Sequence, residues 1–503
     1  MARVPLLILL FVLCLGQFLI PSRQETQCVC GLKKTLLVLA DFPEYPHISS
    51  NTEIASLFAR ASRYFHDVSY GKLTIEGNAT DWIRLPKLYS QYAGKDLQGT
   101  LVNVAQDAFY SASQSFNMSS FDFIVLVLSF YPSLSGDFLP SYDHPIHTVT
   151  GTLRGFAVVE EDRDWSAYAR GFALSLGLWR FETKLSGMQA NDLAASGEGD
   201  MSAWSKVTLG WVNDSQLLSL DTPTVNRILT LDPIEDPGED GLALRIRLGA
   251  NLGEYWVEVR QPLGYDRNLL PSYGAVVSFV PSSNVSIQMK KVLQPDVISG
   301  AVFLDSDADV SIIALNVTQG RYRLLIGDAQ VGRDAQLAVY SLSRAQDAIN
   351  AAQMDDRFEN LSLAQDLFDK ANALFNLGRF QDAGALAISA ETMAAASTVP
   401  PDYTQAAQLL TAAQVLRNQT ASTPFNDSPL VREANVQLDI AMRAFGARDF
   451  ALTKQAAQSA IDLFNKARQM ELINTILDWL SNLALIAPII ILAFALRYQL
   501  KGA

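Results

Sequence analysis

An apolar run near the C-terminus constrains this chain more than any other feature. Trp479 to Leu496 is a stretch of 18 residues without a charged side chain, and a helix of that length just crosses a bilayer. Arg497 and Lys501 follow it, so the positive-inside rule predicts a cytoplasmic tail at residues 498–503. We expect one transmembrane helix at residues 477–497, anchoring the chain in the cell membrane with its body on the extracytoplasmic side.

A second apolar run opens the chain. Arg3 precedes the run from Val4 to Ile20, and Pro21 and Ser22 provide a short exit. A basic start, an apolar centre and a small polar end are typical of a secretory signal peptide. We therefore expect a signal peptide at residues 1–24, with an uncleaved anchor as the alternative.

Glycosylation sequons and cysteine usage agree with export. Eight Asn-x-Ser/Thr sequons are candidate glycosylation sites. Cys28 and Cys30 are the cysteines that remain after residues 1–24 are removed. A Cys-x-Cys bridge is strained, so this pair is a candidate for a labile or intermolecular disulfide, and two reduced thiols are the alternative. The sequons are Asn78, Asn117, Asn213, Asn284, Asn316, Asn360, Asn418 and Asn426.

Length and charge limit the class of protein. A chain of 503 residues is too long for one hydrophobic core and predicts two or three folded units. Hydrophobic residues make up 49% and charged residues 18%, which is the composition of a globular protein. The net charge of −13 argues against a nucleic-acid partner, because such a partner needs a basic surface.

The first domain, residues 25–228, alternates strands and helices. Thr35 to Tyr45 predicts a buried strand and Asn51 to Asp67 an amphipathic helix. A second helix from Lys95 to Ser113 precedes a strand from Phe121 to Phe130. This alternation indicates an α/β layer.

The order of these segments resembles secreted metallopeptidases of the immune inhibitor A type. The matching stretches are LLVLADFPEY, YFHDVSYGKLTIEG, DWIRLP and FDFIVLVLSF, followed by GEGDMSAWSKVTLGWV and GEYWVEVRQPLGYDRNLLPSYGAVVSFV. The resemblance covers roughly residues 33–330, and the collinear order of several motifs carries it. It implies a zincin-like metallopeptidase fold for the first domain.

The helix that would hold zinc in this family has lost its ligands here. The family pattern HExxHxLGxxD provides two His ligands one turn apart, a Glu general base and a later Asp ligand. Placed on the Leu-Gly-Leu at residues 176–178, it puts Arg170, Gly171, Leu174 and Arg180 at those positions. Arg stays protonated, and Leu and Gly offer no lone pair. The resemblance therefore implies a scaffold without zinc or catalytic residues; an active zinc peptidase with an atypical ligand set is the alternative.

Histidine offers no obvious replacement ligand set. The chain has His47, His66, His144 and His147. The last two form a His-x-x-His pair, but Pro145 breaks the helix that would align their rings. We interpret this pair as loop polarity and His66 as structural.

The second domain, residues 229–332, predicts a β-sandwich. Strand-like runs at 242–248, 254–260, 274–280 and 321–327 alternate with turn signals. In the loop DSDAD, Asp305, Asp307 and Asp309 alternate in a way that calcium can use, and solvated turns are the alternative. Calcium is therefore the one cofactor that we keep as a candidate.

The third domain, residues 335–473, predicts an α-helical repeat. Sliding the chain by 70 residues places Phe375 on Phe445 and Phe380 on Phe450. The stretch LGRFQDAGALAISA resembles half of a tetratricopeptide-like hairpin, in which small residues let helices approach. Such hairpins usually bind proteins, so we expect a protein partner here; a helical stalk is the alternative.

Together these features predict a multidomain α+β chain with four parts: a zincin-like domain, a β-sandwich, a helical hairpin repeat and one C-terminal membrane helix. The function that we expect is that of a membrane-anchored pseudopeptidase acting in protein binding or cell-envelope assembly. An active metallopeptidase and a cell-surface stalk or adhesion protein are the alternatives.

Overall fold

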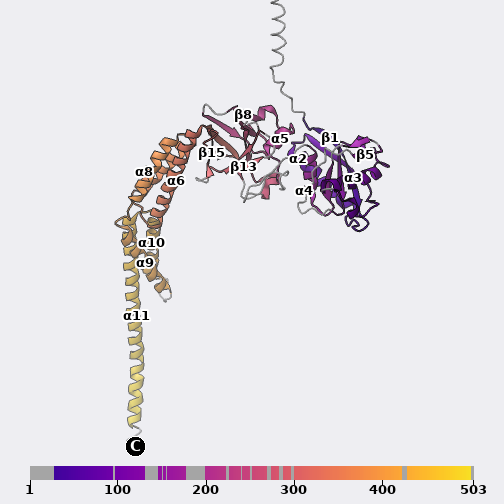
Figure 1. The fold of residues 1–503 in the computed structure, drawn as a ribbon. Coiled ribbons are helices and arrows are strands. Elements are labelled where there is room, and N and C mark those ends of the chain that lie inside the picture. The colour runs from indigo at the N-terminus through magenta and orange to yellow at the C-terminus, as the bar shows by residue number, and fades with distance from the viewer. Residues whose placement is uncertain are drawn as a thin grey trace, which may run out of the picture. The chain divides into compact units, whose positions relative to one another are not determined.

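The computed structural model describes residues 28–94, 97–130, 146–149, 151–153, 156–176, 199–221, 226–238, 241–249, 252–268, 273–282, 287–295, 300–421 and 428–499. The chain divides into two compact units. The first comprises Met1–Tyr340 and Asn372–Gly384, and the second Ser341–Ala371 and Ala385–Ala503. The predicted mixed α+β class is confirmed: helices accompany several separate sheets (Figure 1).

The N-terminal part of the first unit is a parallel sheet covered on both faces. Its strands follow the order β2-β1-β4-β7, and every neighbouring pair is parallel. The strands are β1 Gly31–Asp41, β2 Leu73–Ala79, β4 Phe123–Leu128 and β7 Ala157–Glu160, with the short β3 Ile83–Arg84 also paired with β1. The β4 strand lies within the range predicted from its apolar run, whereas β1 begins four residues before the predicted Thr35 and ends at Asp41. Near-continuous Leu and Val runs are typical of strands buried on both faces.

Alternation along β1 assigns each helix to a face. Leu37 and Leu39 enter one core with α2 Asn51–Val68 and α4 Trp165–Ser175. Leu36 and Val38 enter the opposite core with α3 Leu97–Ala112. The α2 helix starts at a capping box, in which Ser50 accepts from the backbone N–H of Glu53 and the Glu53 carboxylate accepts from that of Ser50. Thus α2 and α4 pack side by side on the same face of the sheet.

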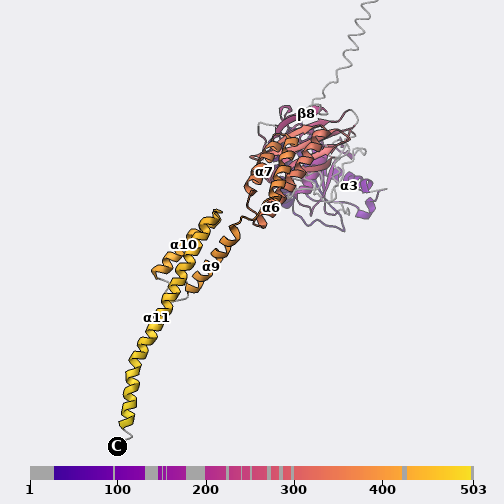
Figure 2. The same cartoon turned by 90° about the vertical axis from the view of Figure 1, so that its left-hand side faces the viewer.

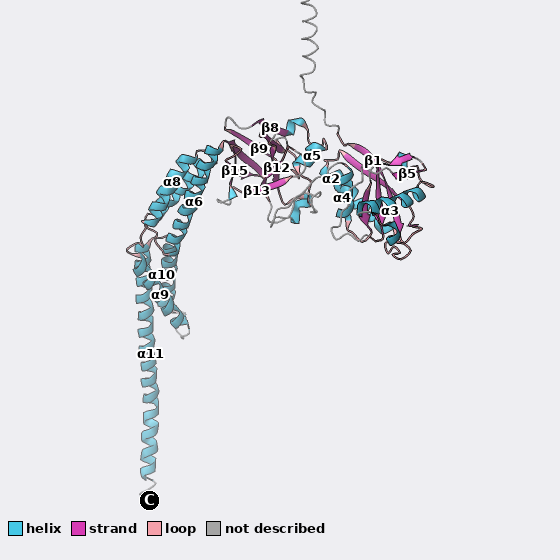
Figure 3. Cartoon of the chain, viewed as in Figure 1, coloured by secondary structure: helices cyan, strands magenta, loops and turns pink. Residues whose placement is uncertain are grey.

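Two further sheets pack face to face through one shared core. One has the order β13-β12-β11-β10-β8 and the other β14-β15-β16-β9 (Figure 3). Val257 and Val277 of the first sheet share this core with Ile312 and Leu324 of the second. The strands are β8 Leu217–Asp221, β9 Arg227–Leu231, β10 Ala243–Arg247, β11 Glu254–Arg260, β12 Gly274–Val280, β13 Gln288–Leu293, β14 Val302–Asp305, β15 Val310–Thr318 and β16 Arg321–Gly327.

The sandwich starts earlier in the chain than residue 229. The β8 strand pairs with β10 in parallel register, and β9 already begins at Arg227. The signal for β8 is weak because its side chains are only partly buried. Short elements connect these layers: β5 Ile146–Thr148, β6 Gly151–Leu153, α5 Ala203–Thr208, and the 3₁₀ turns Tyr89–Tyr92, Met118–Ser120, Asp214–Gln216 and Gly264–Asn268.

The C-terminal helices repeat after 70 residues. Turns at Gly378 and Arg448 take the same left-handed conformation, and each brings two Phe rings together: Phe375 with Phe380, and Phe445 with Phe450. A further helix precedes each hairpin, so the repeating unit has three helices where the sequence predicted two. The helices are α6 Ala329–Met354, α7 Leu361–Asn376, α8 Phe380–Ala395, α9 Tyr403–Ala421, α10 Pro429–Gly446 and α11 Phe450–Gln499.

The last helix, α11, packs in the repeat through its first part and contains the apolar run in its second part. Figure 2 shows α9, α10 and α11 side by side, with α11 continuing alone. Ala457, Ala460 and Phe464 of α11 are fully buried against α9 and α10. Beyond Ala467 its described side chains are exposed or partly exposed, and it is long and apolar enough to cross a membrane. One candidate membrane helix near the C-terminus is thus present, as predicted.

Candidate functional site

The helix that the resemblance equates with a zinc-binding helix is packed as a core element. Asp164 caps the start of α4 by accepting from the backbone N–H of Ser166 at 2.9 Å. Tyr168 and Phe172 are fully buried, and Phe172 contacts Phe58 of α2 at 5.4 Å between ring centroids. The described side chains from Trp165 to Ala173 are buried except that of Arg170. This part of α4 offers little surface to a substrate.

The four family positions fall differently in the structure. Gly171 faces the sheet: a Cβ built there would lie 3.2 Å from the Ala157 Cβ and 3.4 Å from Val159 Cγ2. Arg170 is partly exposed and keeps an electrostatic or hydrogen-bond partner. Leu174 is described by its backbone alone, within α4, and Arg180 lies outside the described residues. Gly171 therefore allows close helix–sheet packing, and no side chain at this position can act as a base.

A polar cluster surrounds the carboxyl end of β1. Asp41 is buried and accepts from Arg84 Nε at 2.6 Å and Nη2 at 2.8 Å. The His47 Nδ1 lies 2.7 Å from Asp41 Oδ2, and its ring stacks on Trp82 at 4.5 Å. Burial would raise the pKa of Asp41, but hydrogen bonds from Arg84 and His47 hold it below its usual value. This carboxylate is charged and fully engaged.

Glu161 fixes the loop that carries His47. It follows β7, is buried, and accepts from the backbone N–H groups of Ile48 at 3.0 Å and Ser49 at 2.8 Å. The Trp82 indole N–H donates to the Ser49 carbonyl at 3.0 Å. The carboxyl ends of β1 and β7 are thus tied together by side chains whose polar atoms are already in use.

A buried charge network joins the parallel-sheet region to the sandwich within the first unit. Arg260 is 1% exposed and donates to Glu258 Oε1 at 2.7 Å, to Asp266 Oδ2 at 2.8 Å and to the Asp200 carbonyl at 3.0 Å. The backbone N–H of Asp200 donates to Asp266 Oδ1 at 2.6 Å, and Glu258 also accepts from the backbone N–H of Ala203. Arg260 therefore holds the segment before α5 against β11.

Lys206 extends this network to the turn after α2. It is fully buried, and its Nζ donates to Asp200 Oδ2 at 2.9 Å and to the Tyr70 hydroxyl at 3.1 Å. Tyr70 in turn donates to the Ile234 carbonyl at 2.7 Å. Burial would lower the pKa of Lys206, but Asp200 and Tyr70 raise it above its ordinary value, so the ammonium stays charged.

Glu235 is the protonated member of the group. Burial raises its pKa to about 10, and the neighbouring Asp266 carboxylate adds to the rise. Its Oε2 accepts from the backbone N–H of Gln261 at 3.2 Å. Glu235 is therefore neutral at pH 7. We call this buried network of ion pairs, centred on Arg260 and Lys206, an ionic lock, because it holds two layers together and offers no exposed acid–base pair to a substrate.

The sequence contained this network without revealing it. Glu258, Arg260 and Asp266 lie in the stretch EYWVEVRQPLGYD, and Asp200 and Lys206 in GEGDMSAWSK, both of which carried the family resemblance. The sequence showed that these residues lie in the stretches that carry the resemblance, but not that they contact one another. A Lys and an Arg that alternate with apolar residues could have been flagged as buried, but their partners required the fold.

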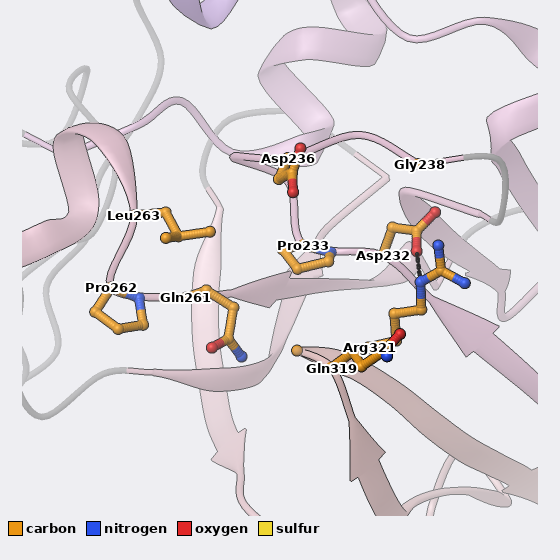
Figure 4. A pocket seen from close by; sticks show the side chains of 10 residues that line it. Asp232, Pro233, Asp236, Gly238, Gln261, Pro262, Leu263, Gln319 and Arg321 are labelled. Atoms are coloured by element: carbon orange, nitrogen blue, oxygen red, sulfur yellow. Dashed lines mark ion pairs between the residues drawn. The ribbon is translucent and has the colours of Figure 1, made fainter.

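A pocket of about 360 Å³ lies beside the network (Figure 4). Asp232, Asp236, Gln261, Gln319 and Arg321 contribute to its wall. Arg321 Nε pairs with the buried Asp232 Oδ1 at 2.9 Å, which neutralises that carboxylate. Pro233, Pro262 and Leu263 also line it, so the pocket has a mixed polar and apolar wall.

The calcium candidates are engaged in turns. Asp305 accepts from the Tyr255 hydroxyl and from the backbone N–H of Asp307 and Ala308. Asp309 accepts from the backbone N–H of Ala329 at 2.9 Å. Among the residues that the structure describes, no group of three or more His, Cys, Asp or Glu side chains is placed to hold a metal. Calcium binding stays a prediction.

The remaining predicted residues are placed as follows. Asn78, Asn117, Asn213, Asn360 and Asn418 are exposed and Asn316 is partly buried. Asn284 and Asn426 lie outside the described residues, as do residues 1–24, for which a signal peptide is predicted. Cys28 and Cys30 form a disulfide beside Gly210. His147 lies in β5 and His144 outside the described residues.

No protein-family model matches the chain, and a search of curated proteins finds no match. Function is therefore argued from the residues and their arrangement.

Proposed function

We propose that the chain is a membrane-anchored extracytoplasmic protein with a metallopeptidase-like domain that binds protein partners or organises the cell envelope without cleaving substrates. The observation that carries the proposal is Gly171. The family places its general base there, and in this chain the position has no side chain and lies against Ala157 and Val159. Arg170 stands beside it at the position of the first zinc ligand.

The arrangement of the elements supports a peptidase-like origin. The family motifs describe a strand, a helix, a second strand and a later helix, and here α2 and α4 pack on one face of a parallel sheet. The motif residues Tyr70, Lys206 and Arg260 meet in one buried network. Their contacts in this chain hold layers together, a role that needs no catalytic chemistry.

The test is metal content and peptidase activity of the full chain in detergent. Zinc is measured by elemental mass spectrometry and cleavage with casein as substrate. We expect zinc well below one per chain and no cleavage above a blank. Stoichiometric zinc that is lost on chelation together with the cleavage would contradict the proposal, and would point to a ligand set that includes residues outside the described ranges.

The anchor and its orientation are tested in cells. We propose that α11 inserts with residues 498–503 in the cytoplasm, because Arg497 and Lys501 follow the apolar run. Protease added to intact cells should remove the body, and a tag placed after Ala503 should stay protected. If the body is protected from the protease, the proposed orientation is wrong and the body lies in the cytoplasm.

A stalk role for the helical repeat is the second candidate, and α11 favours it. The same helix packs in the repeat through Phe464 and Ala467 and then continues into the apolar run without interruption. A continuous helix is a stiff connection, unlike a Gly- or Ser-rich linker. Inserting a short Gly-Ser linker after Arg468 separates the two roles, because it breaks the stiff helix and leaves the repeat intact. If the repeat is a stalk, the variant loses its function; if the repeat is a docking surface, the variant still binds its partner.

A further inference from the structure

A polar stripe runs along α11 where it leaves the repeat. From Glu471 to Leu483 the polar residues recur every three or four positions, which places them on one face of the helix, and the apolar residues occupy the other faces. The polar set is Glu471, Asn474, Thr475, Asp478, Ser481 and Asn482, and the apolar set is Leu472, Ile473, Ile476, Leu477, Trp479, Leu480 and Leu483.

The centre of this stripe lacks partners in the described chain. Asn474, Asp478 and Asn482 are spaced four residues apart, are exposed, and make no hydrogen bond or ion pair with a described residue. Thr475 differs, because its hydroxyl donates to the Glu471 carbonyl of its own helix at 2.8 Å. Two amides and one carboxyl group are therefore available to partners from outside the described chain.

The stripe lies at the outer end of the predicted membrane helix, residues 477–497. Asp478 and Asn482 fall within its first two turns, and Asn474 lies one turn before it. Exposed large apolar side chains continue on both sides of this boundary, from Leu472 to Leu492, so apolar surface flanks the stripe where the helix enters lipid. Polar side chains in lipid are costly when unpaired and hold helices together when paired.

The stripe also continues a face that is already used for packing. Phe464 and Ala467 are buried in the repeat, and Glu471, Asn474 and Asp478 follow them at alternating spacings of four, three and four residues. This is the spacing of a helix–helix seam. In the repeat, α9 and α10 cover this seam at Phe464 and Ala467. After Glu471 the described part of the chain leaves the seam exposed.

We infer that α11 pairs with α11 of a second copy of this chain at the outer end of its membrane segment, through Asn474, Asp478 and Asn482. The inference rests on the proposed membrane anchor. All copies insert with the same orientation, so each of these residues meets its equivalent at the same depth. An amide carries both a donor and an acceptor and pairs with its own kind across a two-fold axis.

The two amides also reduce the repulsion between the Asp478 carboxylates of a pair. Two Asp478 carboxylates facing each other repel, but Asn474 and Asn482 stand one turn above and below and offer N–H donors across the pair. A polar residue at one seam position also fixes register and copy number. The stripe thus favours a parallel pair in one register.

The experiment measures energy transfer between full-length chains labelled at the C-terminus and reconstituted in phosphatidylcholine vesicles. The test variant is N474L/D478L/N482L, which keeps the helix and makes it more apolar. The matched control is I473L/I476L/L480I, which changes the lipid-facing side with the same volumes. We expect the test variant to lower the association constant by about tenfold or more, and the control and D478N to retain transfer.

Vesicle flotation is measured first, so that the two proposals fail separately. Chains that do not float with the vesicles contradict the anchor, and the pairing with it. The chains can also float while the energy transfer falls with lipid dilution as it does for labels that do not interact. That result overturns the pairing and leaves the anchor intact. So does a test variant with wild-type transfer, or cross-linking of Asn482→Cys in native membranes to a different protein in place of a second copy.

Discussion

Arg448 holds a left-handed backbone conformation, φ 61°, at the position that Gly378, φ 78°, occupies 70 residues earlier. The turns are closed by equivalent bonds: Gly378 N–H donates to the Phe375 carbonyl at 2.8 Å, and Arg448 N–H to the Phe445 carbonyl at 3.0 Å. Glycine adopts this conformation freely, whereas Arg carries a steric cost. The Arg448 guanidinium lies 4.4 Å from the centre of the Phe358 ring, a cation–π contact that offsets part of that cost.

Two substitutions of Arg448 separate backbone strain from the cation–π contact. Arg448→Ala loses the contact and keeps the strain, whereas Arg448→Gly loses both. We expect the Gly variant to be more stable than the Ala variant by about 1 kcal/mol. The measurement is chemical unfolding of the full chain in detergent, followed by helical circular dichroism. Equal stabilities would show that the turn is not strained.

Removing Arg260 should be severe, because it leaves Glu258 and Asp266 buried without their cation. We expect Arg260→Met to lower the free energy of unfolding by about 3–5 kcal/mol, the usual cost of breaking a buried ion pair. The control is Arg247→Met. Arg247 pairs with Asp221 at an exposed site and should change stability by less than about 1 kcal/mol. Similar effects for both variants would remove the argument for an ionic lock.

Stability of the first unit should fall as the pH rises from 5 to 9. The pKa of Glu235 is about 10 in the folded chain and ordinarily 4.5, so the folded state binds more protons in this window. Burial also raises the pKa of Asp200, which acts in the same direction. The lowered pKa values of Asp41 and Asp266 act near pH 4 and below, outside the window.

The variant Glu235→Gln isolates this effect, because a neutral amide replaces the protonated acid. We expect the variant to lose less stability than the wild type between pH 5 and pH 9. Unfolding curves of both proteins at the two pH values measure the difference. A variant with the wild-type slope would show that Glu235 is ionised in the folded chain.

Much of the fold could be predicted because its strands and helices are strongly patterned. Leu36 to Ala40 form a continuous apolar run, and the α2 helix begins at a Ser and Glu that match a capping box. The strand β8 was missed because its side chains are half-exposed and its pairing with β10 spans a long loop. The additional helix of the second repeat was missed because α9 has no clear apolar face.

The sites were harder to predict, since partners far apart in sequence decide them. Arg260 and Asp200 are 60 residues apart, and although the apolar neighbours of Arg260 indicate burial, the sequence does not show which residues it pairs with. That Gly171 has no side chain to act as a base is visible in the sequence itself. Its contact with Ala157 was not visible, because only the fold brings β7 against α4.

Gly171→Ala tests whether α4 is packed as tightly as a core helix. The added Cβ meets Ala157 and Val159 at short contact distances, so we expect a loss of about 1–3 kcal/mol from overpacking. Gly446→Ala is the control, because nothing lies within 4 Å of its Cβ position and Ala is the better helix former. It should be neutral or stabilising. A neutral Gly171→Ala would mean that α4 can move from the sheet and open the space that a substrate needs.

Charges placed in the apolar run should release the chain from the membrane. Leu485 and Ile489 are exposed on α11 and lie one turn apart within the run. An Arg in the centre of a membrane helix costs about 2.5–3.5 kcal/mol by insertion measurements, so Leu485→Arg with Ile489→Arg should move the protein from the membrane to the soluble fraction. The matched pair Leu452→Arg with Gln455→Arg adds the same two charges at exposed positions of α11 inside the repeat and should stay in the membrane. Retention of the doubly charged variant after alkaline extraction would show that another segment holds the chain.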